Sequence, residues 1–246
     1  MRAAYPILLI TALVGEIWLA FLLVRHAVQR KFPFFFAYIL YSVLASAAQL
    51  VTASHYKVYF LVFWTNEAVL AILSIMAVLE VFRWVFALFW LLKWFRLGFY
   101  AVLALVLLVP ITNALLKPPV HVPPLVAAIL SAGIAVNFVQ GAICALFWLL
   151  VKHFDIGFRR FAFGIMLGFG PLSCGKLIAW VLRSEFGTRF TLLGIYFPPV
   201  AYLLALAFWL LVFSRPEPPE PEWQLPITPQ QLLDQIKQYT RIVKKL

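Results

Sequence analysis

Three ionisable side chains, Glu16, Glu67 and Lys176, lie inside long apolar stretches of the chain. An ionisable group is costly to bury in lipid, and it commonly pairs with an opposite charge or marks a substrate or proton pathway. At about 1.5 Å per helical residue, the three lie roughly 15, 13 and 9 Å from those ends of their stretches that are predicted below to face outside. Because their depths match and their charges are opposite, we expect these residues to meet in a ligand-binding or proton site.

Three amide side chains, Asn66, Asn137 and Gln140, lie at similar or slightly greater depths and are added to this candidate site. Amides and ion pairs also hold transmembrane helices together by hydrogen bonds. A purely structural polar cluster is therefore the alternative interpretation of the same residues.

Two further features have local explanations. Arg83 follows Glu80 by three residues, the spacing at which helical side chains meet, so we expect a structural ion pair. Pro171, Pro198 and Pro199 lie within apolar stretches, and proline removes a backbone hydrogen bond. We therefore expect helix kinks at these prolines.

The sequence contains no motif that indicates an enzyme or a cofactor. The four histidines, His26, His55, His121 and His153, lie at the ends of apolar stretches or between them, which argues against a haem held inside the spans. No Cys and His residues have zinc-site spacing. There is no Gly-x-Ser-x-Gly or His-Glu-x-x-His sequence. We expect no catalytic residue, no metal and no cofactor.

The composition places the chain in a membrane. Of its 246 residues 65% are hydrophobic and 12% charged, whereas soluble domains carry roughly 25% charged residues. So apolar a chain needs lipid as its solvent, and a chain that crosses lipid satisfies its backbone in helices. We therefore expect an all-α integral membrane protein. Its net charge of +11 is interpreted as a signal for membrane orientation and not for nucleic-acid binding.

The apolar stretches predict a bundle of about seven transmembrane helices within a 1–213 domain, since one crossing takes about 20 residues. We expect a retained first helix and not a cleaved signal peptide, because the stretch contains Glu16 and ends at Arg25. The sequence does not fix the inner end of the third helix between residues 80 and 96. These residues either extend the helix or lie flat at the membrane surface. The expected spans are 6–24, 34–53, 58–79, 97–116, 125–151, 161–182 and 190–213.

The distribution of basic residues predicts the orientation. Only Arg2, Lys57, Lys117, Arg183 and Arg189 fall on the side of the N-terminus, while Lys176 lies within a span and the other Lys and Arg residues fall on the opposite side. The more basic side is normally cytoplasmic. We expect an outside N-terminus and a cytoplasmic C-terminus, in a bacterial inner membrane or another plasma membrane.

The C-terminal tail has two predicted parts. Residues 214–227 are rich in Pro and Glu, which is typical of an extended spacer. Residues 228–246 start with Thr228 and Pro229, a helix-start pattern, and then repeat apolar residues at helical spacing. We expect a short amphipathic helix that rests on the inner leaflet or binds a cytoplasmic protein partner.

Two functions from different classes follow. A polar site in the outer half, together with a cytoplasmic tail, favours a sensor-like or receptor-like protein or an accessory subunit. The prolines inside the spans favour a small-solute or proton-coupled transporter, because interrupted helices form the sites of many transporters.

Overall fold

The structure is a computed structural model that describes residues 4–116, 124–157, 159–186 and 191–217. The chain divides into two compact units, Met1–Pro216 and Glu217–Leu246. The amphipathic helix expected at 228–246, and the expected spacer beyond Glu217, lie outside the described residues.

The first unit is helical throughout its described length except at short joints. The long helices agree closely with the seven expected stretches, with bounds that differ by a few residues. In chain order the helices are α1 (Ala4–Arg25), α2 (Val28–Lys31), α3 (Pro33–Thr52), α4 (Tyr56–Val85), α5 (Ala87–Trp90), α6 (Lys93–Leu116), α7 (Pro124–His153), α8 (Arg160–Phe186) and α9 (Thr191–Phe213).

Within the described residues, six helices are long and apolar enough to cross a membrane: α1, α3, α4, α7, α8 and α9. The expected fourth span corresponds to α6, a helix of 24 residues that is not among these six. A protein embedded in a membrane through apolar helices is thus supported, whereas the count of seven crossings and their orientation stay predictions.

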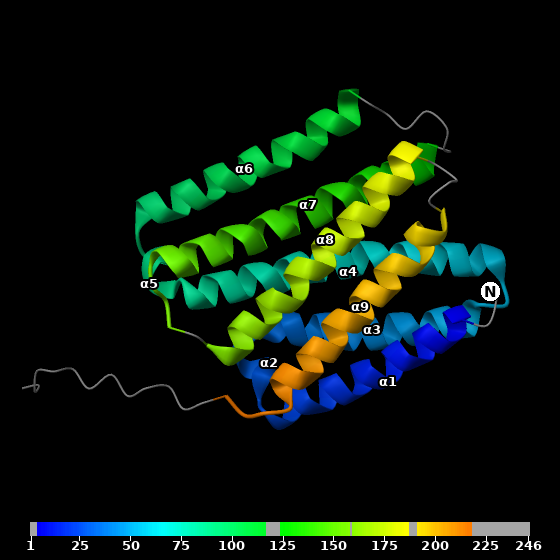
Figure 1. Cartoon of the computed structure of the whole chain (residues 1–246), viewed down its shortest axis with the longest axis horizontal. Coiled ribbons are helices and arrows are strands. Elements are labelled where there is room, and N and C mark those ends of the chain that lie inside the picture. Colours follow the sequence, from blue (N-terminus) through cyan, green and yellow to red (C-terminus); the bar gives the residue numbers. More distant parts are fainter. Residues whose placement is uncertain (1–3, 117–123, 158, 187–190, 218–246) are drawn as a thin grey trace, which may run out of the picture. The chain divides into compact units, whose positions relative to one another are not determined.

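These six helices form a closed ring. The helix α1 packs against both α3 and α9, and the ring continues from α3 through α4, α7 and α8 back to α9. The helix α6 packs against α7 on the outside of the ring (Figure 1). We call α1, α3, α4, α7, α8 and α9 the ring helices.

The stretch between residues 80 and 96 combines a helix extension with a short joint. The helix α4 continues to Val85, the four-residue α5 follows, and α6 begins at Lys93. The interpretation that the third helix extends beyond residue 79 is therefore correct as far as Val85.

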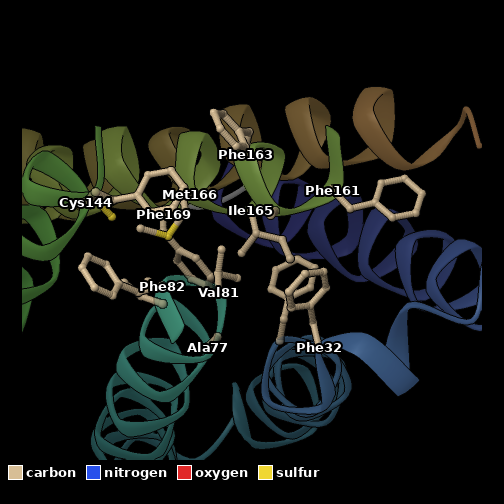
Figure 2. Packing of buried hydrophobic residues seen from close by; sticks show 14 of the residues in the cluster. Phe32, Ala77, Val81, Phe82, Cys144, Phe161, Phe163, Ile165, Met166 and Phe169 are labelled. Atoms are coloured by element: carbon tan, nitrogen blue, oxygen red, sulfur yellow. The ribbon is translucent and has the colours of Figure 1, made fainter. Parts of the chain in front are cut away.

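One half of the ring is filled with apolar side chains, and we call it the packed half. Its buried residues form one hydrophobic cluster in which aromatic rings meet mostly edge to face, for example Phe35 with Trp209 at a centroid distance of 5.3 Å. Figure 2 shows the side chain of Val81 on α4 pointing toward Met166 and Phe169 on α8, while the ring of Phe82 lies on the side of Cys144 of α7. The packed half comprises residues 19–25, 33–39, 77–85, 143–151, 161–169 and 205–213.

Close approach of α8 and α9 in the packed half depends on a glycine. A Cβ atom added to Gly168 would fall on the indole of Trp209, which is fully buried. Only a residue without a side chain fits there. The absence of a side chain at residue 168 therefore lets the largest residue of α9 fill the centre of the packed half.

The structure gives Glu80 a different partner from the one expected. Its carboxylate accepts the backbone N–H of Phe34 at 3.0 and 3.3 Å and that of Phe35 at 3.3 Å. These N–H groups belong to the first turn of α3, where no intrahelical acceptor exists and a negative charge is favourable. Arg83 instead lies over the ring of Trp90, 5.4 Å from its centroid. The expected ion pair of Glu80 with Arg83 is replaced by a helix cap between α4 and α3.

A candidate ligand site in the hollow half

The other half of the ring contains two cavities, and we call it the hollow half. It comprises residues 8–16, 42–49, 59–74, 132–140, 172–180 and 198–203 of the ring helices. The first cavity has a volume of about 320 Å³ and lies between α1, α3, α4, α8 and α9. The second has a volume of about 290 Å³ and lies between α4, α7 and α8. Both volumes are near the lower end of the range for small-molecule sites.

Glu16 provides a buried carboxylate in the first cavity. Its side chain is only 1% exposed, and Oε1 accepts a hydrogen bond from the Tyr202 hydroxyl at 2.7 Å. The same hydroxyl is 3.1 Å from Oγ of Ser42. The second carboxylate oxygen, Oε2, is buried and has no hydrogen-bond partner among the described residues. Since a buried carboxylate oxygen normally has a partner, this atom is an unsatisfied acceptor in the wall of the first cavity.

Glu67 and Lys176 form an ion pair between α4 and α8. The Lys176 Nζ atom donates to Oε2 of Glu67 at 3.3 Å, and both side chains are partly exposed. Both residues line the first and the second cavity. The pair thus lies at the boundary that the two cavities share.

The second cavity is lined by amides and apolar groups. Gln140 accepts a hydrogen bond from the Ser74 hydroxyl through Oε1, at 3.3 Å. Asn137 donates to the backbone carbonyl of Gly133, one turn earlier in α7, at 2.7 Å. Both amides thus have protein partners although they line the cavity, and the bond between Gln140 and Ser74 joins α7 to α4.

The structure divides the six sequence-predicted site residues between the two cavities and places one of them outside both. Glu16, Glu67 and Lys176 all line the first cavity, whereas Asn137 and Gln140 line the second. Asn66 lines neither of the two: its Oδ1 accepts from the Tyr41 hydroxyl at 2.9 Å, and its Nδ2 donates to the Ala45 carbonyl at 3.5 Å. The role of Asn66 is therefore to join α4 to α3.

The prolines lie inside continuous helices. Pro171 lies in α8, and Pro198 and Pro199 lie in α9 without a break in either helix. Pro198 and Pro199 line the first cavity. Each proline leaves the carbonyl four residues earlier without its usual backbone donor.

Several residues of the first cavity were not predicted from the sequence. Ser42, Ser46 and Gln49 repeat every three or four residues along α3, all three are buried, and all line the cavity. That spacing places them on one helix face, so a search for polar stripes in apolar helices could have found them. Tyr202 has no such signal, since its partner Glu16 is 186 positions away in the chain.

One side of the first cavity is aromatic. Tyr59, Phe63 and Trp64 come from the first turns of α4, and Trp180 comes from α8. The rings of Trp64 and Trp180 meet edge to face at a centroid distance of 5.9 Å. Aromatic rings next to a carboxylate offer both apolar contact and a negative ring face to a ligand.

Comparison of this chain with family models, with curated proteins and with solved structures finds no significant match. Among the described residues, no group of three His, Cys, Asp or Glu side chains could hold a metal ion.

Proposed function

We propose that this protein binds a small molecule in the first cavity and acts as a sensor-like or receptor-like membrane protein or as an accessory subunit. The observation that carries this proposal is the buried Oε2 atom of Glu16, which lacks a protein partner in the described structure. A carboxylate in lipid is costly to bury, and a ligand that satisfies this oxygen would reduce the cost.

The proposal includes a topology of seven crossings, with the N-terminus outside and the tail of residues 214–246 in the cytoplasm of a bacterial inner or other plasma membrane. Three basic residues support its orientation. At the end of the packed half that is remote from the cavities, Lys31 and Arg159 lie 5.8 and 4.5 Å from the ring centroid of Trp84, and Arg83 lies over Trp90. Basic residues and tryptophans are typical of a cytoplasmic membrane boundary. The hollow half then faces outside.

The helix α9 offers a physical connection between the ligand site and the tail. Its Pro198, Pro199 and Tyr202 line the first cavity, Trp209 fills the packed half, and the helix ends at Phe213. A ligand that changes the Tyr202–Glu16 hydrogen bond would act directly on this helix. A movement of α9 would then be transmitted to a partner protein bound to residues 228–246.

A second candidate function is transport of a small solute, coupled or not to protons. It is favoured by the two cavities, which share Glu67, Lys176 and four other lining residues. If the Glu67–Lys176 pair opened, a solute could pass from one cavity to the other. A site between two alternately open cavities is what alternating access requires.

Filling each cavity separately tests the binding proposal. Ala12 lines only the first cavity and Ala71 only the second. In lipid nanodiscs, Ala12→Leu should abolish saturable small-molecule binding, while Ala71→Leu should retain it. Equal binding by both variants and the wild type would contradict a site in the first cavity.

Cysteine labelling separates the sensor from the transporter. Leu70 lines both cavities, so Leu70→Cys is introduced into a background in which Cys144 and Cys174 are replaced by Ala. A membrane-impermeant thiol reagent should label Leu70→Cys from the outside only in a sensor and from both sides in a transporter. Deletion of residues 217–246 should abolish signalling output in a sensor and leave flux intact in a transporter.

A further inference from the structure

The first cavity has an unbalanced set of charges. Its charged lining residues are Glu16, Glu67 and Lys176. Lys176 is engaged by Glu67 at 3.3 Å, whereas the Glu16 carboxylate accepts from a neutral group, the hydroxyl of Tyr202, at 2.7 Å. With both carboxylates ionised, the formal charge of the lining is one negative unit, and it is concentrated at Glu16. A ligand with one positive charge would neutralise this lining.

The aromatic side of the cavity favours the same kind of ligand. The ring of Tyr59 stacks on that of Phe63 at 6.2 Å, and Phe63 meets Trp64 edge to face at 5.2 Å. Aromatic faces attract an ammonium group, most strongly where water is excluded, and they also accommodate an apolar body. The rest of the lining is mainly aliphatic, from Leu8, Leu9, Leu70 and Leu203.

We propose that the ligand of the first cavity is a small organic amine with a single positive charge and an aromatic or aliphatic body. Its ammonium group donates a hydrogen bond to Oε2 of Glu16, the carboxylate oxygen without a protein partner in the described structure. Its body lies against the aromatic residues of α4 and α8. This proposal rests on the proposed function, because it names the ligand class of the same site.

Anionic ligands fit this site less well. An anion would have to separate Lys176 from Glu67 and would lie in the same cavity as two carboxylates. Breaking a partly buried ion pair leaves a charge without a partner, which is costly. A neutral ligand with a hydroxyl group could donate to Oε2 of Glu16, but it would not balance the charge.

Three probes of similar size test the ligand class: phenethylamine, 2-phenylethanol and phenylacetate. Their binding to the full chain in nanodiscs is measured by calorimetry and by quenching of tryptophan fluorescence. We expect phenethylamine to bind roughly tenfold or more tightly than the other two, since a charged partner is worth at least that much in a desolvated site. Tightest binding by the carboxylate or the alcohol, or no binding of any probe, would overturn the amine proposal.

Conservative variants separate charge from shape. Glu16→Gln removes the charge but keeps the size, and should weaken phenethylamine binding roughly tenfold or more while leaving 2-phenylethanol binding nearly unchanged. Glu16→Asp retains the carboxylate and should keep part of the preference for the amine. Glu80→Gln is the matched control, because it removes a carboxylate of α4 that lies outside both cavities. Retention of the full amine preference by Glu16→Gln would overturn the proposal.

The variant Ala12→Leu distinguishes this inference from the proposed function. If alcohol or carboxylate binds and Ala12→Leu abolishes that binding, while the amine does not bind, the amine proposal fails and the binding function stands. If all bound probes bind equally well to Ala12→Leu, they bind elsewhere, and both proposals fail.

Discussion

The six ring helices pack in two different ways along their length. In the packed half, Phe35, Phe82 and Trp209 are fully buried and their rings contact neighbouring aromatic rings. In the hollow half, the buried side chains include Glu16, Ser42 and Gln49, and two cavities remain between the helices. The same helices thus provide both a close-packed core and a site with room for a ligand. Substitutions should therefore have different effects in the two halves.

The largest effect is expected for Trp209→Ala in the packed half. Loss of a fully buried tryptophan should lower the free energy of unfolding by about 3–5 kcal/mol, because the neighbouring rings cannot fill the space. The matched variant Trp64→Ala, beside the first cavity, should cost much less, since one side of that ring already borders empty space. Unfolding of both variants in mixed micelles by increasing SDS measures the difference. Equal losses would mean that the two halves are equally well packed.

Added volume should also be harmful in the packed half. Gly168→Ala places a methyl group on the Trp209 indole and should cost about 1–3 kcal/mol. Gly98→Ala is the control, because a Cβ atom there meets nothing within 4 Å, and alanine favours the helix by up to about 1 kcal/mol. The same unfolding assay should show opposite signs for the two substitutions.

The helix cap of α3 should have a smaller effect. Glu80→Ala removes the acceptor of the Phe34 and Phe35 N–H groups and should cost up to about 2 kcal/mol. Arg83→Ala removes only the contact with Trp90 and should cost about 0.5–1 kcal/mol. Additive effects in the double variant would agree with two separate interactions. Strong coupling in that double-mutant cycle would show instead that Glu80 and Arg83 interact directly, as their spacing in the sequence predicts.

The smallest effect on stability is expected for Ala12→Leu in the hollow half. A larger apolar side chain fills part of an existing cavity, which should leave the free energy of unfolding unchanged or raise it by about 0.5–2 kcal/mol. Its effect on ligand binding should nevertheless be severe. A destabilisation as large as that of Gly168→Ala would contradict the presence of free space beside Ala12.

The sequence predicted the depth of Glu16, Glu67 and Lys176, because depth follows from counting residues along a helix. It did not predict that Glu16 meets Tyr202, since the contact of α1 with α9 depends on how the ring closes. For Glu80, the nearest opposite charge in the sequence was the wrong partner. The free N–H groups of α3 lie 45 and 46 positions away in the chain, and only packing brings them to the carboxylate.

The sequence by itself determined that this chain is helical and membrane-embedded, and it placed the long helices to within a few residues. Apolar stretches of sufficient length must form helices in lipid, where every backbone N–H and C=O group needs an internal partner. The tertiary structure decided which helices are neighbours, which half of the ring is packed and which polar groups share a cavity. Those features depend on the shapes of side chains far apart in the sequence, such as Gly168 with Trp209 and Glu67 with Lys176.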